Sequence, residues 1–354
     1  MSVKKAILCF LLVSLCVSGV ILYWSIDSSS WEIFKNADRG RIAIACVMVV
    51  LTWMLDALKV KFLTMAADER ISFLFSFELT MINYFGSALT PMQSGGGPFQ
   101  MYMMYQNGIG FGKSAAITLV RTIMTVAILG ATIPISVVLG IHLPKMGIDM
   151  NVFIEYMLVV ILLVWTVIAL SLLRPKLLKR WVYALLMKIE RLGFLSKSRA
   201  KQAVKRFVNE ADSYNTIMRE LITNGRKHFL LGIITAIAQM WVYLSIMPCL
   251  IWALNMPFNY VDCVVVEAIF IFMLYFVPSP GGSGAAEYGA AMVFRLFVPW
   301  SAAGMLGVGW RFLSEYTGIA VGIVVAMKVI GWQLTNKLFK SGDKGNVPCE
   351  DKKI

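Results

Sequence analysis

Long apolar stretches recur along this chain of 354 residues, and they restrict its fold more than any other feature. They are 17 to 27 residues long and fall near 6–24, 42–58, 71–89, 114–140, 152–173, 229–254, 261–277 and 314–334. A helix needs about 20 apolar residues to cross the hydrocarbon core of a bilayer. Because lipid cannot satisfy an open sheet edge, such spans are helical. The sequence therefore predicts an all-α, polytopic integral membrane helix bundle of about eight spans, forming a single domain over residues 1–354.

The composition leaves no room for a soluble catalytic domain. The chain is 58% hydrophobic and 15% charged, whereas soluble domains average about 25% charged residues. Residues 1–24 imitate a signal peptide, but no small-residue cleavage pattern follows, so we expect an uncleaved first span. The six cysteines show neither metal-ligand nor Cys-x-x-Cys spacing, and we expect no metal and no cofactor.

The net charge of +13 indicates topology rather than a nucleic-acid partner, because the basic residues sit between and after apolar segments. Residues 174–228 hold 14 Lys and Arg against four acids, and the tail after 334 is also basic. The short loop after the second span adds Lys59, Lys61 and Arg70. Both termini, including the tail 341–354, are thus predicted to be cytoplasmic, in the cytoplasmic (inner) membrane of a prokaryote. The basic loop 174–228 fits an amphipathic helix on an anionic membrane surface or a helical hairpin packed against the bundle.

Two Pro/Gly clusters interrupt the apolar pattern. The first covers Thr90–Pro98 and the second covers Pro278–Glu287; short apolar pieces follow, which makes broken segments of 90–106 and 278–298. Proline removes a helical donor, and consecutive glycines favour non-helical backbone. At membrane depth such backbone is tolerated where it is buried in protein or lines a wet cavity. The alternative is that the glycines only permit close packing of helices.

The two clusters occupy similar places in two halves of the chain, 1–173 and 229–340. Arg121 follows Pro91 by 30 residues, and Arg311 follows Pro280 by 31. Loop charges make segment 71–89 run outward and segment 261–277 run inward. We therefore predict an inverted repeat with two Pro/Gly-broken or re-entrant half-helices, a pattern that marks the binding site of many transporters.

Charged residues inside apolar segments usually face the bundle interior and pair there. Arg311 and Glu315 are four apart and share a helix face, which favours a buried ion pair. Alternatively, Arg121 and Arg311 bind an anionic phosphate, which suits bidentate guanidinium geometry. Helix N-termini after Pro98 and Gly284 would add partial positive charge to such a site.

The acidic residues of the apolar segments differ in position. Asp56 and Asp262 lie nearer segment ends and are predicted to be interfacial. Glu78, Glu267 and Glu287 are the candidates for carrying a proton, although no energy-coupling motif is present.

At the two breaks the sequence resembles the lysylphosphatidylglycerol synthetase transmembrane-domain family, also called flippase-like or YbhN-like proteins. The likeness rests on Thr90–Pro98 with Gln100 and Tyr102, and on the Pro-x-Pro-Gly-Gly-x-Gly-x-x-Glu signature of Pro278–Glu287. The resemblance implies a module that, in bifunctional relatives, translocates aminoacylated phosphatidylglycerol and lowers sensitivity to cationic antimicrobial peptides. A separate C-terminal domain attaches lysine in those relatives. This chain ends about 20 residues after its last predicted span, so we expect that lysyltransferase activity to be absent.

The chain departs from the family pattern in its first motif. Many members carry an acidic residue after the paired glycines and a basic residue soon afterwards, where this chain has Gly97 and Gln100. The loss of a charged pair puts head-group specificity in question, while the glutamate of the second motif is kept as Glu287.

The leading hypothesis is a membrane lipid translocase or lipid transporter. Its substrate would be an anionic or zwitterionic phospholipid or a polyprenyl-phosphate-linked lipid, with membrane lipids as partners. The predicted substrate-binding residues are Pro91, Gln93, Gly95, Gly96, Gly97, Gln100, Arg121, Pro278, Pro280, Gly281, Gly282, Gly284, Glu287, Arg311 and Glu315. Two other classes stay open: a lipid-modifying enzyme such as a phosphatidylglycerol lysyltransferase, and an accessory membrane subunit of a separately encoded transferase. No nucleophile–base pair or phosphate loop supports the enzyme.

Overall fold

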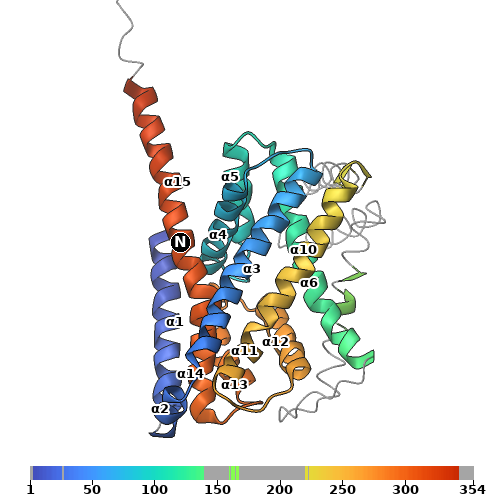
Figure 1. Cartoon of the computed structure of the whole chain (residues 1–354). Coiled ribbons are helices and arrows are strands. Elements are labelled where there is room, and N and C mark those ends of the chain that lie inside the picture. Colours follow the sequence, from blue (N-terminus) through green and yellow to red (C-terminus); the bar gives the residue numbers. More distant parts are fainter. Residues whose placement is uncertain are drawn as a thin grey trace, which may run out of the picture.

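The computed structural model describes residues 3–25, 28–138 and 223–342, with short pieces at 159, 161–163, 165–166 and 220–221. Every regular element in these ranges is helical (Figure 1). Four helical stretches within them are long and apolar enough to cross a membrane: Arg39–Ala66, Phe111–Ser136, Arg226–Ala253 and Trp300–Val329. The prediction of an all-α polytopic membrane protein is confirmed. Most of the predicted span 152–173, of the basic loop 174–228 and of the tail 341–354 lies outside the described residues.

The helices fall into two groups along the chain. The first group is α1 (Val3–Ser25), α2 (Ser28–Lys35), α3 (Arg39–Ala66), α4 (Phe73–Leu89), α5 (Gly96–Gln106) and α6 (Phe111–Val138). The second group is α10 (Arg226–Leu244), α11 (Ile246–Ala253), α12 (Tyr260–Leu274), α13 (Ala285–Phe294), α14 (Trp300–Arg311), the π-helical turn η1 (Phe312–Tyr316) and α15 (Thr317–Gly342).

Polar side chains begin three of these helices. Asp38 accepts hydrogen bonds from the backbone N–H groups of Gly40 and Arg41 before α3. Ser72 does the same for Phe75 before α4, and Asn259 for Val261 before α12. Such caps satisfy N–H groups that have no partner within the helix, so they determine where the helix starts.

Helices α3 and α10 pack antiparallel along their lengths (Figure 1). At one end, the Asp38 N–H donates to the Ala253 carbonyl oxygen at 2.8 Å. At the other end Gly225 lies against Ala66, so closely that a Cβ atom on Gly225 would stand 2.2 Å from the Ala66 oxygen. The long helix α3 therefore lies alongside α10 and α11 from end to end.

The segments predicted as spans at 71–89 and 261–277 form helices shorter than the four long apolar stretches. Helices α4 and α12 have 17 and 15 residues, fewer than the roughly 20 that a span needs. Each ends at a Pro/Gly loop, after which the chain returns as α5 or α13. In Figure 1 the α4–α5 hairpin lies in the upper part of the molecule and the α12–α13 hairpin in the lower part. The two spans stay predictions, and the expected breaks form the tips of two helical hairpins.

The order of helices supports the predicted inverted repeat. The first half contains α3, α4, α5 and α6 in this order. Their counterparts in the second half are α10–α11, α12, α13 and α14–α15, and these helices run in the opposite direction to those of the first half. Helices α5 and α13 each begin five residues after a tip proline, Pro91 or Pro280, and α6 and α14 each begin 20 residues after it. The last span also starts earlier than the predicted 314, because the π turn η1 joins α14 to α15 without a break.

The two hairpin tips meet through their backbones. Pro91 and Pro280 form an antiparallel bridge. The Gly281 N–H donates to the Thr90 oxygen at 3.2 Å, and the Met92 N–H donates to the Val277 oxygen at 3.2 Å. The breaks that lie far apart in the sequence therefore form one structural unit.

The tips also share one backbone conformation. Met92 and Gln93, which follow the first proline, have φ angles of 55° and 54°. Gly281 and Gly282, which follow the second, have φ angles of 59° and 69°. Glycine adopts this left-handed conformation freely, whereas a residue with a Cβ atom adopts it at a cost of roughly 1–2 kcal/mol. The second tip is therefore relaxed, and the first holds two strained residues.

Each half has an apolar core that anchors its hairpin. In the first half, Leu63, Leu79 and Met104 belong to a buried cluster contributed mainly by α3 to α6. In the second half, Phe272 and Phe294 belong to a cluster contributed mainly by α10 to α14. Charged side chains, which do not belong to these two apolar clusters, lie beside the tips.

Candidate functional site

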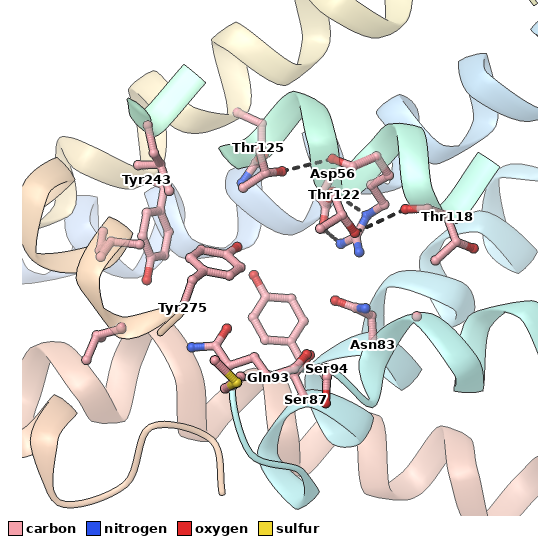
Figure 2. A pocket seen from close by; sticks show the side chains of 18 of the residues that line it. Asp56, Asn83, Ser87, Gln93, Ser94, Thr118, Thr122, Thr125, Tyr243 and Tyr275 are labelled. Atoms are coloured by element: carbon pink, nitrogen blue, oxygen red, sulfur yellow. Dashed lines mark hydrogen bonds and ion pairs between the residues drawn. The ribbon is translucent and has the colours of Figure 1, made fainter. Parts of the chain in front are cut away.

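A cavity of about 540 Å³ lies beside the hairpin tips (Figure 2). Its walls come from α3, α4, α5, α6, α10, α12, α14, η1 and the first tip. The polar side chains that line it are Asp56, Lys59, Asn83, Tyr84, Ser87, Gln93, Ser94, Thr118, Arg121, Thr122, Thr125, Gln239, Tyr243, Tyr275, Arg311 and Glu315. Non-helical backbone at membrane depth is expected to border a cavity of this kind.

Asp56 binds two cations on one wall of the cavity. Its carboxylate accepts hydrogen bonds from the Arg121 Nη2 and Nε atoms, the latter at 3.3 Å. It also lies 2.8 Å from Lys59 Nζ, which donates to Gln239 Oε1 at 3.0 Å. Lys59, Asp56 and Arg121 are 1%, 3% and 9% exposed. One buried carboxylate thus pairs with two buried cations, which leaves a local net charge of +1.

The expected places of Asp56 and Lys59 are therefore wrong. The sequence suggested an interfacial aspartate and a loop lysine, because the apolar run ends near 58. Helix α3 continues to Ala66, and the three-residue spacing puts both side chains on one helical face. Asp262, in contrast, lies in the first turn of α12 and is half-buried, close to where it was expected.

Gln100 helps to orient Arg121. Its amide Nε2 donates to the Leu79 carbonyl oxygen at 2.8 Å, and its Oε1 accepts from Arg121 Nη1 at 3.5 Å. Gln100 is 1% exposed and stands behind the cavity wall. This residue, one of the family departures, thus connects the first hairpin to the cationic wall.

Arg311 binds two carboxylates and the second tip. Its Nη2 donates to the Gly281 carbonyl oxygen at 2.5 Å. Its Nε lies 3.7 Å from Glu287 Oε1, and its Nη1 lies 3.9 Å from Glu315 Oε1. The predicted ion pair between Arg311 and Glu315 is present. One cation and two carboxylates leave this cluster with a net charge of −1.

Glu287 caps the helix that follows the second tip. Its Oε2 accepts from the Gly284 N–H at 2.6 Å, and its Oε1 accepts from the Tyr316 hydroxyl at 2.5 Å. The first tip has Pro98 at the matching place, seven residues after its proline, and the equivalent Gly95 N–H is bound instead by Thr90 Oγ1 at 2.6 Å. The first hairpin thus replaces a carboxylate cap by a hydroxyl cap.

The π turn η1 carries two residues of the anionic cluster. Glu315 accepts from the Tyr243 hydroxyl at 3.4 Å, and Tyr316 reaches Glu287. A π turn inserts one extra residue into a helix and is frequent at functional sites. Here it lets consecutive residues of one helix reach two partners. Figure 2 shows Tyr243 and Tyr275 on the side of the cavity opposite Asp56 and Thr122.

The predicted site residues fall into two groups. Those that line the cavity are Gln93, Gly97, Arg121, Arg311 and Glu315. Those that stand behind it and shape the tips are Pro91, Gly95, Gly96, Gln100, Pro278, Pro280, Gly281, Gly282, Gly284 and Glu287. A substrate-binding role for either group stays a prediction.

The sequence reasoning missed several residues that line the cavity. Lys59, Gln239 and three tyrosines, Tyr84, Tyr243 and Tyr275, were not among the candidates. The spacing of Asp56 and Lys59 was a usable signal, since ion pairs form three residues apart on a helix. A tyrosine within an apolar run gives no such signal, because packing against a core explains it equally well. The described ranges hold no group of three or more His, Cys, Asp or Glu side chains suited to a metal ion.

Two opposed helical hairpins that meet beside a charged cavity define a multi-pass membrane protein with a broken-helix core. Comparison with known families gives its affiliation: residues 11–322 match the model of the lysylphosphatidylglycerol synthase TM region. The chain belongs to this family.

A curated relative matches over nearly the whole chain. It is described as a UPF0104 membrane protein of Archaeoglobus fulgidus and is 24% identical over 314 residues. The match covers 89% of this chain and 94% of the relative.

Proposed function

We propose that this protein is a lipid translocase whose central cavity receives a phosphate-bearing lipid head group. The observation that carries the proposal is the Asp56 cluster, in which two buried cations share one carboxylate. An excess buried charge is costly in a membrane protein. A phosphate bound at Lys59 and Arg121 would neutralise that excess and accept charge-assisted hydrogen bonds from both side chains.

The opposite charge of the second cluster favours particular head groups. Arg311 is outnumbered by Glu287 and Glu315, so this side of the cavity carries a net charge of −1. Tyr243 and Tyr275 add aromatic faces that attract cations. A head group with a phosphate at one end and an amine at the other would match both clusters. Simple anionic phospholipids and polyprenyl phosphates would use the cationic wall alone.

The charges of the loops support one orientation of the protein in the membrane. We place in the cytoplasm the end where α3 ends and α10 begins, because the basic loop 174–228 leads into α10. The α4–α5 hairpin would then enter from the cytoplasmic side of the inner membrane, and the α12–α13 hairpin from the opposite side. A lipid modified in the cytoplasmic leaflet by a separately encoded transferase would meet the first hairpin. Export of an aminoacylated lipid would lower the negative charge of the outer leaflet and, with it, sensitivity to cationic peptides.

Leaflet exchange in proteoliposomes tests the proposal. Fluorescent phosphatidylglycerol, phosphatidylethanolamine and a polyprenyl phosphate would each be followed from one leaflet to the other. Lys59→Met should slow exchange at least about tenfold, since a hydrogen bond to a charged group contributes about 1.5–3 kcal/mol. Lys328→Met is the matched control, because that lysine is 70% exposed and pairs with Glu78 outside the cavity. Exchange no faster than in empty vesicles for all three lipids, or equal rates in the two variants, would refute the proposal.

A further inference from the structure

Glu267 of α12 is a buried carboxyl group that the lipid proposal does not use. Its side chain is 1% exposed. The indole N–H of Trp310 donates to its Oε1 at 2.8 Å, and its Oε2 has no hydrogen-bond partner. An ionised carboxylate with a single neutral donor is strongly disfavoured inside a membrane bundle, whereas a protonated carboxylic acid is tolerated.

The groups around Glu267 supply no compensating charge. Trp310 of α14, Cys263 of α12 and Tyr243 of α10 face it, and none of them is a cation. The elements packed on α12 carry these further ionisable groups: Lys113 and Arg121 of α6, Arg226, Lys227 and His228 of α10, Cys249 of α11, and Glu287 and Tyr288 of α13. Arg121 is bound to Asp56, and Glu287 is bound to Arg311. In the described part of the chain no lysine or arginine pairs with Glu267.

The equivalent residue of the other hairpin shows the contrast. Glu78 precedes Pro91 by 13 residues, and Glu267 precedes Pro280 by 13 residues. Glu78 lies 2.7 Å from Lys328 Nζ, so its charge is compensated. The two glutamates occupy matching places in the repeat, but only Glu78 has a cation.

Glu267 lies one helical turn from the cavity. Ile271 and Leu274 of the same helix line the cavity, and they are four and seven residues from Glu267, which puts all three on one face. Trp310, which donates to the carboxyl group, packs its ring against Tyr243 of the cavity wall, with ring centroids 6.4 Å apart. A small displacement of this indole would bring water from the cavity to the carboxyl group.

We propose that Glu267 is a proton-binding site: it holds a proton in the packing described here and releases it only when Trp310 moves and admits water. After the proton leaves, the carboxylate would have to be hydrated. Water can reach it only if Trp310 moves, so loss of the proton requires α12 and α14 to pack against each other in a second arrangement. The proton is the ligand of this site, which is separate from the head-group site and does not depend on it.

Infrared spectroscopy of the purified full-length protein in lipid vesicles tests this at neutral pH. The wild-type protein should show the carbonyl stretch of a protonated carboxylic acid. Glu267→Gln should abolish that band, and Glu78→Gln, the matched control, should leave it unchanged. Trp310→Phe should move the band to higher frequency, because the indole hydrogen bond to the carbonyl oxygen is lost.

Each outcome decides the proposal. A band that disappears in Glu267→Gln, or that shifts in Trp310→Phe if the first variant does not fold, supports it. A wild-type spectrum without the band, or a band that survives Glu267→Gln, overturns it. The measurement needs no transported lipid, so its failure is distinct from a failure of lipid exchange.

Discussion

Two substitutions that each remove one charge from the Asp56 cluster should have very different effects on stability. Asp56 alone compensates Arg121 and Lys59, with 2.8 Å between its carboxylate and Lys59 Nζ. At an effective dielectric constant of about 20, two unit charges at that distance attract by about 6 kcal/mol before desolvation is counted. Asp56→Asn leaves two buried cations without a carboxylate. Removal of one partner of a buried pair costs about 3–5 kcal/mol, so we expect at least this loss in the free energy of unfolding.

Lys59→Met should be tolerated. It leaves one carboxylate with one guanidinium, a balanced pair held by two hydrogen bonds from Arg121. Gln239 loses the hydrogen bond that Lys59 donates at 3.0 Å, which costs about 1 kcal/mol. This loss is offset because burial of a methionine, unlike burial of a lysine, does not require an ion to be desolvated. We expect a change in unfolding free energy within about 1 kcal/mol of zero.

Denaturant titration in detergent micelles, followed by tryptophan fluorescence, measures both values. The double variant, in which both substitutions are present, should recover part of the loss seen for Asp56→Asn, because a single buried cation remains. A Lys59→Met protein that is destabilised as much as Asp56→Asn would show that the cluster has no excess positive charge. The electrostatic argument for a phosphate site would then fail.

Three further substitutions and one control probe the hairpins by the same titration. In Gly96→Ala, the new Cβ atom would lie 2.2 Å from Asn83 Nδ2, and we expect a loss of about 1–3 kcal/mol. Gly19→Ala, where nothing lies within 4 Å, is the control and should change little. Met92→Gly removes the strain of a φ angle of 55° and should stabilise the protein by about 1 kcal/mol, so a loss would contradict the strain. Glu287→Gln removes a charge 3.7 Å from Arg311 Nε and should lower the free energy of unfolding by about 1–3 kcal/mol. An unchanged midpoint of the denaturant titration would mean that Glu315 alone compensates the charge of Arg311.

The breaks could be predicted from the sequence because proline and glycine act locally. Pro91, Pro280 and the glycines beside them disfavour helical backbone at the positions where they stand. Their placement in the two halves then indicated that the breaks belong to a repeat. The contact between the tips could not be foreseen in the same way, because it rests on backbone hydrogen bonds to which side-chain chemistry gives no signal.

The charges of the cavity were harder to place. Arg121 and Arg311 stand out within apolar runs, and both do line the cavity. Lys59 does not stand out, because a lysine at the end of an apolar run usually lies at the membrane surface. Its burial depends on Asp56 and on Gln239, which lies 180 residues further along the chain. Only the folded arrangement brings these groups together.

The bridge between Pro91 and Pro280 joins the two hairpins at their tips. Each of its two backbone hydrogen bonds joins a residue of one hairpin to a residue of the other. Neither hairpin can move away from the other without breaking these bonds. Two such bonds contribute only about 1–3 kcal/mol in total, so the two tips would separate spontaneously in a minor fraction of molecules. Under the proposed function, access to the cavity from the two sides of the membrane would therefore depend on a single event, the separation of the tips.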